Sequence, residues 1–523
     1  MRATQSTLVE DLLRPASYPA PTPREVALVS THISWVFLTD DKAWKVRRPV
    51  DFGFVDFSTP EKRRRDCEEE LRLNRRLAPD VYLGQASVHR DACGHNFLGR
   101  GDLVDHAVVM RRLDASSSAA ALLARGELQP SHLTALAQCL AAFYQEAPER
   151  PELKTLAVLR HNVEENLQGL EASGHFLDST LLATACASQR RALAALSERL
   201  DARRAGGHIR DGHGDLRLEH VYFPPVGRVP LVIDAVEFSE RFRCADTALD
   251  IAFLVMELLA AGRRDLAEGF AYQFARASQD YDFYPLLDFY VAYRALVRAK
   301  IACLLANDET SPPDKAARKR GEAIALLTLA TARAESSGTV VVAIGGLVGA
   351  GKSTVAEALA QATGMPVVSS DHTRKHLAGL SASARGSPSL YTDDFTQRTR
   401  HELTRRAEQV LLSGRSVILD ATFRISADRA KARALARTHG ARFLFVEVTC
   451  DEATLQARLV TRATQSSESD ADAAVLAKIR NQFTPPVELP PDERLVVDGR
   501  APVATSVEPV LGAIRRLLCR TPL

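Results

Sequence analysis

The first 110 residues contain short apolar runs, rich in β-branched and aromatic side chains, that alternate with polar turns. These runs are Val26–Val29, Trp35–Leu38, Ala43–Val46 and Ala107–Met110. Their length and composition predict β-strands, and the Asp40-Asp41 pair predicts a turn between two of them. The charged segment Glu61–Leu77 has helical spacing instead. We therefore expect a small lobe made of hairpins and one helix.

Apolar residues recur at helical spacing through most of the following segment, which is rich in alanine and leucine. Examples are Leu133–Tyr144 and Leu181–Leu200. Helical patterns also extend from Thr247 to about Ala334, with a break near Asn307–Pro313. A second strand-rich stretch lies between Ile209 and Phe238. This order predicts a strand-rich small lobe followed by a helical large lobe.

The pattern becomes a regular alternation of strands and helices after the polar sequence Glu335-Ser336-Ser337-Gly338. The predicted strands are Thr339–Ile344, Pro366–Ser369, Ser416–Leu419, Arg442–Val448 and Arg494–Val497. Apolar strands that alternate with helices are typical of a parallel sheet with crossover helices. We therefore predict two domains, residues 1–335 and 336–523, the second with a parallel five-stranded sheet.

Composition supports two or three domains and gives little information about partners. A chain of 523 residues exceeds what one hydrophobic core supports, and 46% hydrophobic with 25% charged residues is usual for a globular protein. The formal net charge of +2 gives no overall attraction to nucleic acid or anionic membranes. We therefore expect neither as a partner, and the oligomeric state stays open.

The cysteines and the hydropathy pattern favour a cytoplasmic protein. The eight cysteines are scattered without a Cys-x-x-Cys pair, so neither a zinc site nor a redox motif is indicated. Acidic residues Glu10 and Asp11 interrupt the region where a signal peptide has its apolar core. The chain also has no run of about 18 apolar residues, the length that a membrane span needs.

The most specific motif is a glycine-rich loop between a predicted strand and a predicted helix. Its residues are Gly346, Leu347, Val348, Gly349, Ala350, Gly351, Lys352 and Ser353, followed by Thr354. They match G-x-x-x-x-G-K-[ST], in which glycines let backbone N–H groups surround phosphates. Lys352 adds a cation at the β- and γ-phosphates, and the Ser353 hydroxyl can bind Mg²⁺. The sequence therefore predicts ATP and Mg²⁺ as cofactors.

Four further residues favour a kinase over a motor or a GTPase switch. Asp371 follows the second predicted strand, where it could orient or deprotonate an acceptor hydroxyl or cap the next helix. Asp420 ends the third strand and could hold the water shell of Mg²⁺ or serve as a turn residue. Arg458 and Arg462 lie four apart, as in a lid over the transferring phosphate or on a solvated basic face.

These features resemble the small P-loop kinases that include gluconate kinase, chloramphenicol phosphotransferase and the zeta-type toxins. The resemblance covers roughly residues 340–520. It implies a P-loop NTPase fold and phosphorylation of a small molecule. The catalytic roles of Asp371, Arg458 and Arg462 are carried over as what the resemblance implies.

A second constellation lies in the N-terminal half, in the sequence His213-Gly214-Asp215 and in Asp234 beyond a predicted hairpin turn at residues 224–229. In kinase-like enzymes an aspartate accepts the proton of the acceptor hydroxyl, and two later residues hold Mg²⁺. Asp215, His220 and Asp234 fall at those places. The His-Gly-Asp sequence resembles the aminoglycoside phosphotransferase branch, which implies a bilobal protein-kinase-like fold.

The predicted small lobe supplies a candidate cation for this second site. Lys45 lies on the third predicted strand, where it would contact ATP phosphates. A helical glutamate would hold it in place. Glu70 shares a helical face with Leu73 and Leu77 and is the first choice, with Glu69 as the alternative.

Two departures from the kinase pattern leave an alternative open. His220 replaces the usual asparagine, and imidazole is a poor ligand for Mg²⁺, so Glu219 is an alternative source of an oxygen ligand. The small lobe also lacks a G-x-G-x-x-G loop and has Ser30–Ser34 between its first strands. The N-terminal domain is therefore either catalytic or a pseudokinase that regulates the P-loop domain.

The order of the two domains resembles the bacterial proteins described as bifunctional aminoglycoside phosphotransferase/ATP-binding proteins, over nearly the whole chain. It implies an α/β and α+β protein that acts as an ATP- and Mg²⁺-dependent small-molecule kinase with two candidate ATP sites. The partner would be a small hydroxyl-bearing acceptor, and the family name does not fix which one. A third hypothesis, a remodelling ATPase, needs basic and aromatic surfaces that the sequence does not show.

Overall fold

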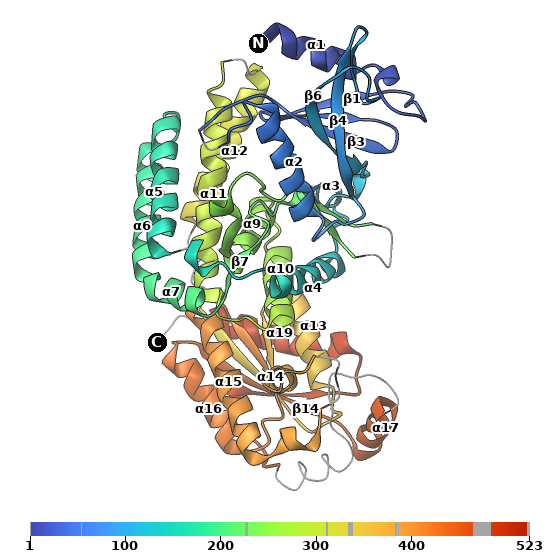
Figure 1. The fold of residues 1–523 in the computed structure, drawn as a ribbon. Coiled ribbons are helices and arrows are strands. Elements are labelled where there is room, and N and C mark those ends of the chain that lie inside the picture. The colour runs from blue at the N-terminus through green and yellow to red at the C-terminus, as the bar shows by residue number, and fades with distance from the viewer. Residues whose placement is uncertain are drawn as a thin grey trace. The chain divides into compact units, whose positions relative to one another are not determined.

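The computed structural model describes residues 2–53, 55–153, 155–224, 229–309, 312–332, 338–381, 384, 386–463 and 483–519 (Figure 1). Contacts within the chain divide it into two compact units. Unit 1 combines Met1–Glu165 with Ser197–Glu257, and unit 2 combines Asn166–Leu196 with Leu258–Leu523. The predicted domain boundary at residues 335 and 336 lies outside the described residues.

Unit 1 contains a six-stranded antiparallel sheet in the order β1-β2-β3-β6-β4-β5. Its strands are β1 (Ala27–Ser30), β2 (Ser34–Leu38), β3 (Lys42–Arg47), β4 (Tyr82–Asp91), β5 (Gly94–Asn96) and β6 (Asp102–Arg111). Helix α1 (Arg2–Leu12) lies against β5, and α2 (Pro60–Asn74) packs on β4 and β6. The strands and the helix predicted from the sequence are present, whereas β4, β5 and α1 were not predicted.

The rest of unit 1 is mostly helical and carries two short strand pairs. Its further helices are α3 (Ala119–Ala124), α4 (Pro130–Glu146), the first part of α5 (Leu156–Ser173), α7 (Ser197–Ala205), α8 (Glu240–Arg243) and most of α9 (Thr247–Ala260). β7 (Ile209–Asp211) pairs with β10 (Cys244–Asp246), and β8 (Val221–Tyr222) pairs with β9 (Leu231–Val232). The β8–β9 pair forms the predicted hairpin, of whose turn residues 225–228 lie outside the described residues.

Unit 2 contains a parallel five-stranded sheet in the order β12-β13-β11-β14-β15. Its strands are β11 (Val340–Gly345), β12 (Val367–Ser369), β13 (Val417–Asp420), β14 (Arg442–Thr449) and β15 (Arg494–Asp498). The helices that follow these strands or close the unit are α13 (Lys352–Thr363), α14 (Ser370–Leu377), α15 (Asp393–Leu412), α16 (Ser426–Thr438), α17 (Glu452–Ala463) and α19 (Val503–Cys519). The prediction of a five-stranded parallel sheet is confirmed.

The central strand β11 is buried along its whole length. Val340, Val342 and Ile344 share a hydrophobic core with residues of α13 and α19. Helix α16 packs against β11 and β14 as well. Full burial explains why this strand is a continuous apolar run, as is usual in parallel sheets covered by helices.

Helices that precede the parallel sheet in the sequence also belong to unit 2. They are α6 (Ser179–Ala195), α10 (Arg264–Ser278), α11 (Tyr284–Ala306) and α12 (Pro313–Thr331). The Tyr281 hydroxyl between α10 and α11 donates to the Val367 carbonyl at 3.0 Å, and Arg415 binds Glu268 at 2.7 Å. The compact units therefore differ from the predicted domains 1–335 and 336–523, because α10 and α11 pack against the sheet domain.

Among the described helices, none is both long enough and apolar enough to span a membrane.

Candidate functional site

The glycine-rich loop connects β11 to α13 and needs glycine at several positions. Gly346 has φ 137°, and a Cβ there would lie 2.3 Å from the Val448 carbonyl oxygen. Gly349 and Gly351 also have positive φ, at 85° and 102°. Because L-residues rarely adopt these conformations, the backbone of the loop requires glycine. The loop ends at Gly351, the N-cap of α13, so the positive end of that helix faces it.

The apolar residues of the loop anchor it. Val348 and Ala350 are buried in the hydrophobic core that β11 shares with α13 and α19. Thr354 is exposed on α13. Lys352 donates to the Leu347 carbonyl at 2.9 Å. The sequence motif therefore forms a loop in which backbone N–H groups, the lysine and a helix N-terminus are available to phosphates, as in nucleotide-binding P-loops.

Ser353 and Asp420 form a pair of oxygen donors beside the loop. β13 lies next to β11 with Asp420 opposite Ile344, so the end of β13 reaches the loop. The Ser353 hydroxyl donates to the Asp420 carboxylate at 2.7 Å. Burial raises the pKa of Asp420, and Lys352 and Ser353 only partly oppose this effect. Hydroxyl and carboxylate oxygens are the ligands that Mg²⁺ prefers, so this pair fits the metal.

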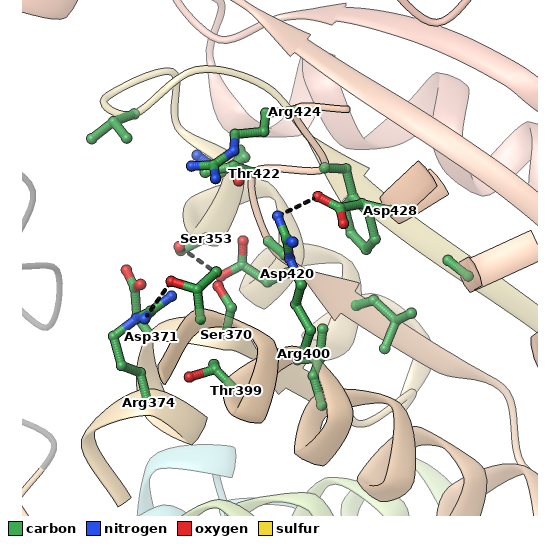
Figure 2. A pocket seen from close by; sticks show the side chains of 18 of the residues that line it. Ser353, Ser370, Asp371, Arg374, Thr399, Arg400, Asp420, Thr422, Arg424 and Asp428 are labelled. Atoms are coloured by element: carbon green, nitrogen blue, oxygen red, sulfur yellow. Dashed lines mark hydrogen bonds and ion pairs between the residues drawn. The ribbon is translucent and has the colours of Figure 1, made fainter. Parts of the chain in front are cut away.

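A cavity adjoins the loop and contains most of the predicted C-terminal site residues (Figure 2). Its polar lining includes Lys352, Ser353, Asp371, Arg374, Thr399, Arg400, Asp420, Thr422, Arg424 and Asp428. Asp371 lies in the first turn of α14, whose N-cap is Ser369, so the alternative role of Asp371 as the N-cap is wrong. The structure thus brings Lys352, Asp371 and Asp420 to one cavity.

Arg458 contacts the backbone of the glycine-rich loop. From α17 its guanidinium donates to the Gly349 carbonyl at 3.1 Å and to the Gly499 carbonyl at 2.7 Å. The side chain of Arg462 lies outside the described residues. The structure therefore places one of the two predicted lid arginines at the loop, and the joint role of the pair stays a prediction.

In unit 1 the structure brings Lys45, Glu70 and Asp234 together. The Lys45 ammonium on β3 lies 2.9 Å from a Glu70 oxygen on α2 and 2.8 Å from an Asp234 oxygen after β9. Glu69, the alternative to Glu70, pairs with Arg72 instead. Strand, helix and hairpin thus meet in the kinase-like arrangement that the sequence predicts.

A buried ion cluster behind Lys45 was not predicted. Arg47, 1% exposed, donates to Asp66, Glu70 and Glu237. These three carboxylates lie close enough to hold a metal, but the Arg47 guanidinium occupies the space between them. The sequence did contain a signal for this cluster. Lys45 and Arg47 lie two apart on a strand, and Asp66 and Glu70 lie four apart on a helix, so each pair shares one face of its element.

The loop between β7 and β8 places Asp215 and His220 near Asp234. His220 donates from Nδ1 to the Asp215 carbonyl at 2.9 Å, because a carbonyl can only accept. Its Nε2 lies 3.7 Å from an Asp234 oxygen and 3.6 Å from a Glu219 oxygen. Asp250 accepts from the N–H groups of His213 and Gly214 and so braces the loop.

Asp234 combines an unusual backbone conformation with a strongly perturbed carboxylate. Its φ is 65°, a conformation that costs a non-glycine residue energy and is common at active sites. Burial opposes its ionisation, but the charges of Lys45 and His220 hold the pKa of Asp234 well below the usual range. Its ionised carboxylate fits Mg²⁺, whereas the imidazole of His220 fits this ion less well.

No glycine-rich loop covers this second site in the described small lobe. A tight turn joins β1 to β2, with the Thr31 N–H donating to the Ser34 carbonyl at 2.9 Å. This turn stands where the sequence has no G-x-G-x-x-G motif. Both hypotheses for the N-terminal half, a catalytic domain and a regulatory pseudokinase, therefore stay open.

Comparison with known proteins covers both halves of the chain. The family described as an AAA domain matches residues 341–486. A gluconokinase structure from Sinorhizobium meliloti is 24% identical, with 35% of this chain and 94% of that chain covered and a TM-score of 0.27. A choline/ethanolamine kinase family protein from Mesorhizobium loti is 15% identical, with 62% and 98% covered and a TM-score of 0.38.

Three mycobacterial proteins are similar along most of the chain. They are the uncharacterized proteins Rv2004c and MT2060 of Mycobacterium tuberculosis and Mb2027c of Mycobacterium bovis. Each is 34% identical over 472 residues, which are 86% of this chain and 88% of the relative. Because the similarity extends over both halves of each protein, the chain belongs to the same family as these three mycobacterial proteins.

Proposed function

We propose that the protein is an ATP-dependent phosphotransferase whose P-loop site phosphorylates a hydroxyl group of a small molecule. The observation that carries this proposal is the shared cavity of Lys352, Asp371 and the Ser353–Asp420 pair. A phosphate-binding loop alone is equally compatible with an ATPase. A carboxylate in a cavity beside the loop adds what a kinase needs, a base next to the place where an acceptor binds.

In the proposed reaction the acceptor oxygen attacks the γ-phosphorus of ATP. The bond between that phosphorus and the β–γ bridging oxygen breaks, and ADP leaves with the electron pair. The hydroxyl proton passes to the Asp371 carboxylate. Lys352, the loop N–H groups and Arg458 stabilise the charge on the transferring group. Mg²⁺ held by Ser353 and Asp420 would supply further neutralisation of the phosphate charge.

The N-terminal site is proposed as a second phosphotransfer site. Lys45, held by Glu70, would bind ATP phosphates, Asp215 would act as the base, and Asp234 would hold the metal, with His220 as an unusual neighbour. The support is the contact of Lys45 with both Glu70 and Asp234 at hydrogen-bond distance. The acceptor class is open for this site.

Measurement of ATP turnover in Lys352→Ala and Asp215→Ala variants tests the proposal. Each substitution removes one site, so each should lower turnover, and the double variant should lose at least about 100-fold. Lys315→Ala, at an exposed position of α12, is the control for an unspecific loss of a lysine. Unchanged ATP turnover in both single variants would contradict the proposal.

The second candidate function makes the N-terminal half a pseudokinase that regulates the P-loop site. It is favoured by His220 in the metal position and by the turn at Thr31 and Ser34 in place of a glycine-rich loop. Phosphotransfer by Lys352→Ala that disappears when Asp215→Ala is added excludes it. Loss of all phosphotransfer in Lys352→Ala alone supports it.

The remaining partner predictions are part of this proposal. The partner is a small hydroxyl-bearing molecule, and the expectation of no nucleic-acid or membrane partner stays a prediction, as does the cytoplasmic location. The oligomeric state stays open.

A further inference from the structure

Three arginines from three separate elements converge on the cavity beside the P-loop. Arg374 comes from α14, Arg400 from α15, and Arg424 from the loop between β13 and α16 (Figure 2). The sequence separates Arg374 from Arg424 by a strand and a long helix, so only the fold brings them together. Such convergence is costly unless an anion compensates, since like charges repel in a partly dehydrated space.

The three arginines differ in how far their charge is balanced. Arg400 forms an ion pair with Asp428 at 2.8 Å. Arg374 donates to the Leu390 carbonyl at 2.6 Å and lies over the Tyr391 ring, 4.8 Å from its centroid. Arg424 and Arg374 each have a buried Nε atom without a hydrogen-bond partner among the described residues. Both guanidinium groups therefore have hydrogen-bonding capacity that the described part of the protein does not use.

The electrostatics agree with the contacts. Burial, together with the charges of Arg400 and Arg424, lowers the pKa of Arg374, although Asp371 opposes the shift. Burial and the charge of Arg400 also lower the pKa of Arg424, although Asp428 and Asp393 oppose it. Burial, with the neighbouring arginines, thus disfavours the charged form of these two groups, and a bound anion would favour it.

The loop that carries Arg424 is fixed in place. Phe423 has φ 44°, an unusual conformation for a bulky residue. The fully buried Arg429 donates to the Phe423 carbonyl at 2.9 Å, and the Thr484 N–H donates to the Arg424 carbonyl at 2.8 Å. A strained backbone that its surroundings hold on both sides is typical of a preorganised binding site.

We infer that the acceptor of the P-loop site carries a carboxylate or phosphate group besides its reacting hydroxyl, and that Arg374 and Arg424 bind this anion. The inference rests on the proposed function and names its substrate class. Asp371 and the γ-phosphate lie at the reacting end, and the bonds formed and broken are those given above. A polycationic aminocyclitol or a quaternary amine does not fit this cavity, because the same arginines repel it.

Calorimetric titration of the full-length protein tests this inference without depending on turnover. The protein is saturated with Mg²⁺ and a non-hydrolysable ATP analogue, so that the P-loop itself is closed to added anions. The probes are matched by carbon skeleton: gluconate and glucose 6-phosphate as anions, sorbitol as the neutral compound and glucosamine as the cation. The carboxylate and phosphate arms show which anion the site prefers.

We expect at least one anionic probe to bind the unmodified protein about tenfold or more tightly than sorbitol, since hydrogen bonds to charged groups give such differences. Arg424→Gln should remove this preference, and Arg424→Lys should restore part of it. Arg437→Gln, at an exposed position later on α16, is the matched control and should bind like the unmodified protein.

Two results overturn the inference. One is equal or tighter binding of sorbitol or glucosamine to the unmodified protein, and the other is an anion preference that persists in Arg424→Gln. A wrong proposed function would be recognised differently. If the P-loop site is not a phosphotransferase, Lys352→Ala does not change the rate of phosphate transfer. A phosphotransferase that prefers neutral acceptors would overturn only the inference.

Discussion

Asp420 is a buried carboxylate whose neighbours only partly compensate for the loss of water. It is 5% exposed, accepts a hydrogen bond from Ser353, and has a pKa raised by burial above its ordinary value of 3.8. A raised pKa means that folding favours the protonated acid. The contribution of Asp420 to the free energy of unfolding is therefore fully present below pH 3.8 and is lost as the pH rises through the raised pKa.

Asp420→Asn should make the nucleotide-free protein more stable at about pH 7, by about 0.5–2 kcal/mol. The amide removes the buried charge and still accepts the hydrogen bond from Ser353. The gain should shrink as the pH falls through the raised pKa of Asp420, because the native acid then becomes protonated as well. Thermal unfolding of both proteins across this pH range checks the prediction.

The same variant should lose the effect of Mg²⁺ on nucleotide binding, and a retained effect would remove Asp420 from the metal site.

Glu70 is the residue that links the two cations of the N-terminal site. One of its oxygens accepts from Lys45 at 2.9 Å and the other from Arg47 at 2.8 Å, and the side chain is completely buried. Glu70→Gln leaves two buried cations with one partner fewer, so we expect a loss of about 3–5 kcal/mol in the free energy of unfolding. Chemical denaturation measures it. Glu68→Gln, two residues earlier and part of a surface pair with Arg64, is the control and should cost less than about 1 kcal/mol.

At the scale of elements, buried parallel strands were the easiest part to predict. β11 and β13 are buried along their lengths and so appear in the sequence as apolar runs, of which the one in β13 ends at Asp420. β4 was missed because exposed, half-buried and buried positions are mixed along it. The order of the strands could not be predicted, because local patterns do not say that β11 lies between β13 and β14.

The turn from β11 into the P-loop should tolerate no side chain at Gly346. Its φ of 137° is unfavourable for an L-residue, and a Cβ would lie 2.3 Å from the Val448 carbonyl oxygen. We expect Gly346→Ala to destabilise the protein by more than about 2 kcal/mol and to abolish nucleotide binding at the loop. Gly269→Ala, within α10 and without a neighbour to clash with, is the control. It should gain about 0.5–1 kcal/mol, and equal thermal shifts for both variants would contradict the assignment.

At the scale of the whole molecule, sequence motifs identified the parts of the sites that lie on one continuous segment. The P-loop is such a segment, and Asp371 and Asp420 could be placed because each follows a predicted strand. Arg400 and Arg424 were missed, since no local signal says that α15 and the β13–α16 loop border the same cavity. Convergence from distant elements becomes visible only with the fold.

The packing of α10 and α11 makes the helices before the sheet part of the P-loop unit. Tyr281 is 3% exposed, and its hydroxyl donates to the Val367 carbonyl. The Arg406 guanidinium lies over the Tyr281 ring, 5.3 Å from the ring centroid. Tyr281→Ala should cost about 3–5 kcal/mol and lower the unfolding temperature of the P-loop unit. Tyr281→Phe keeps the ring and should cost only about 1 kcal/mol. Thermal unfolding with and without nucleotide distinguishes the two variants, because nucleotide raises the unfolding temperature of the P-loop unit. If neither variant changes that temperature, α10 and α11 are dispensable for the unit.

The central claim is that the P-loop site is a phosphotransferase. The most direct test follows the label of γ-³²P-ATP into acceptor, with Asp215→Ala as the background so that only the P-loop site is active. We predict that this background transfers label and that adding Lys352→Ala or Asp371→Asn lowers the rate by about 100-fold or more. Label transfer that is unchanged by both additions would contradict the account.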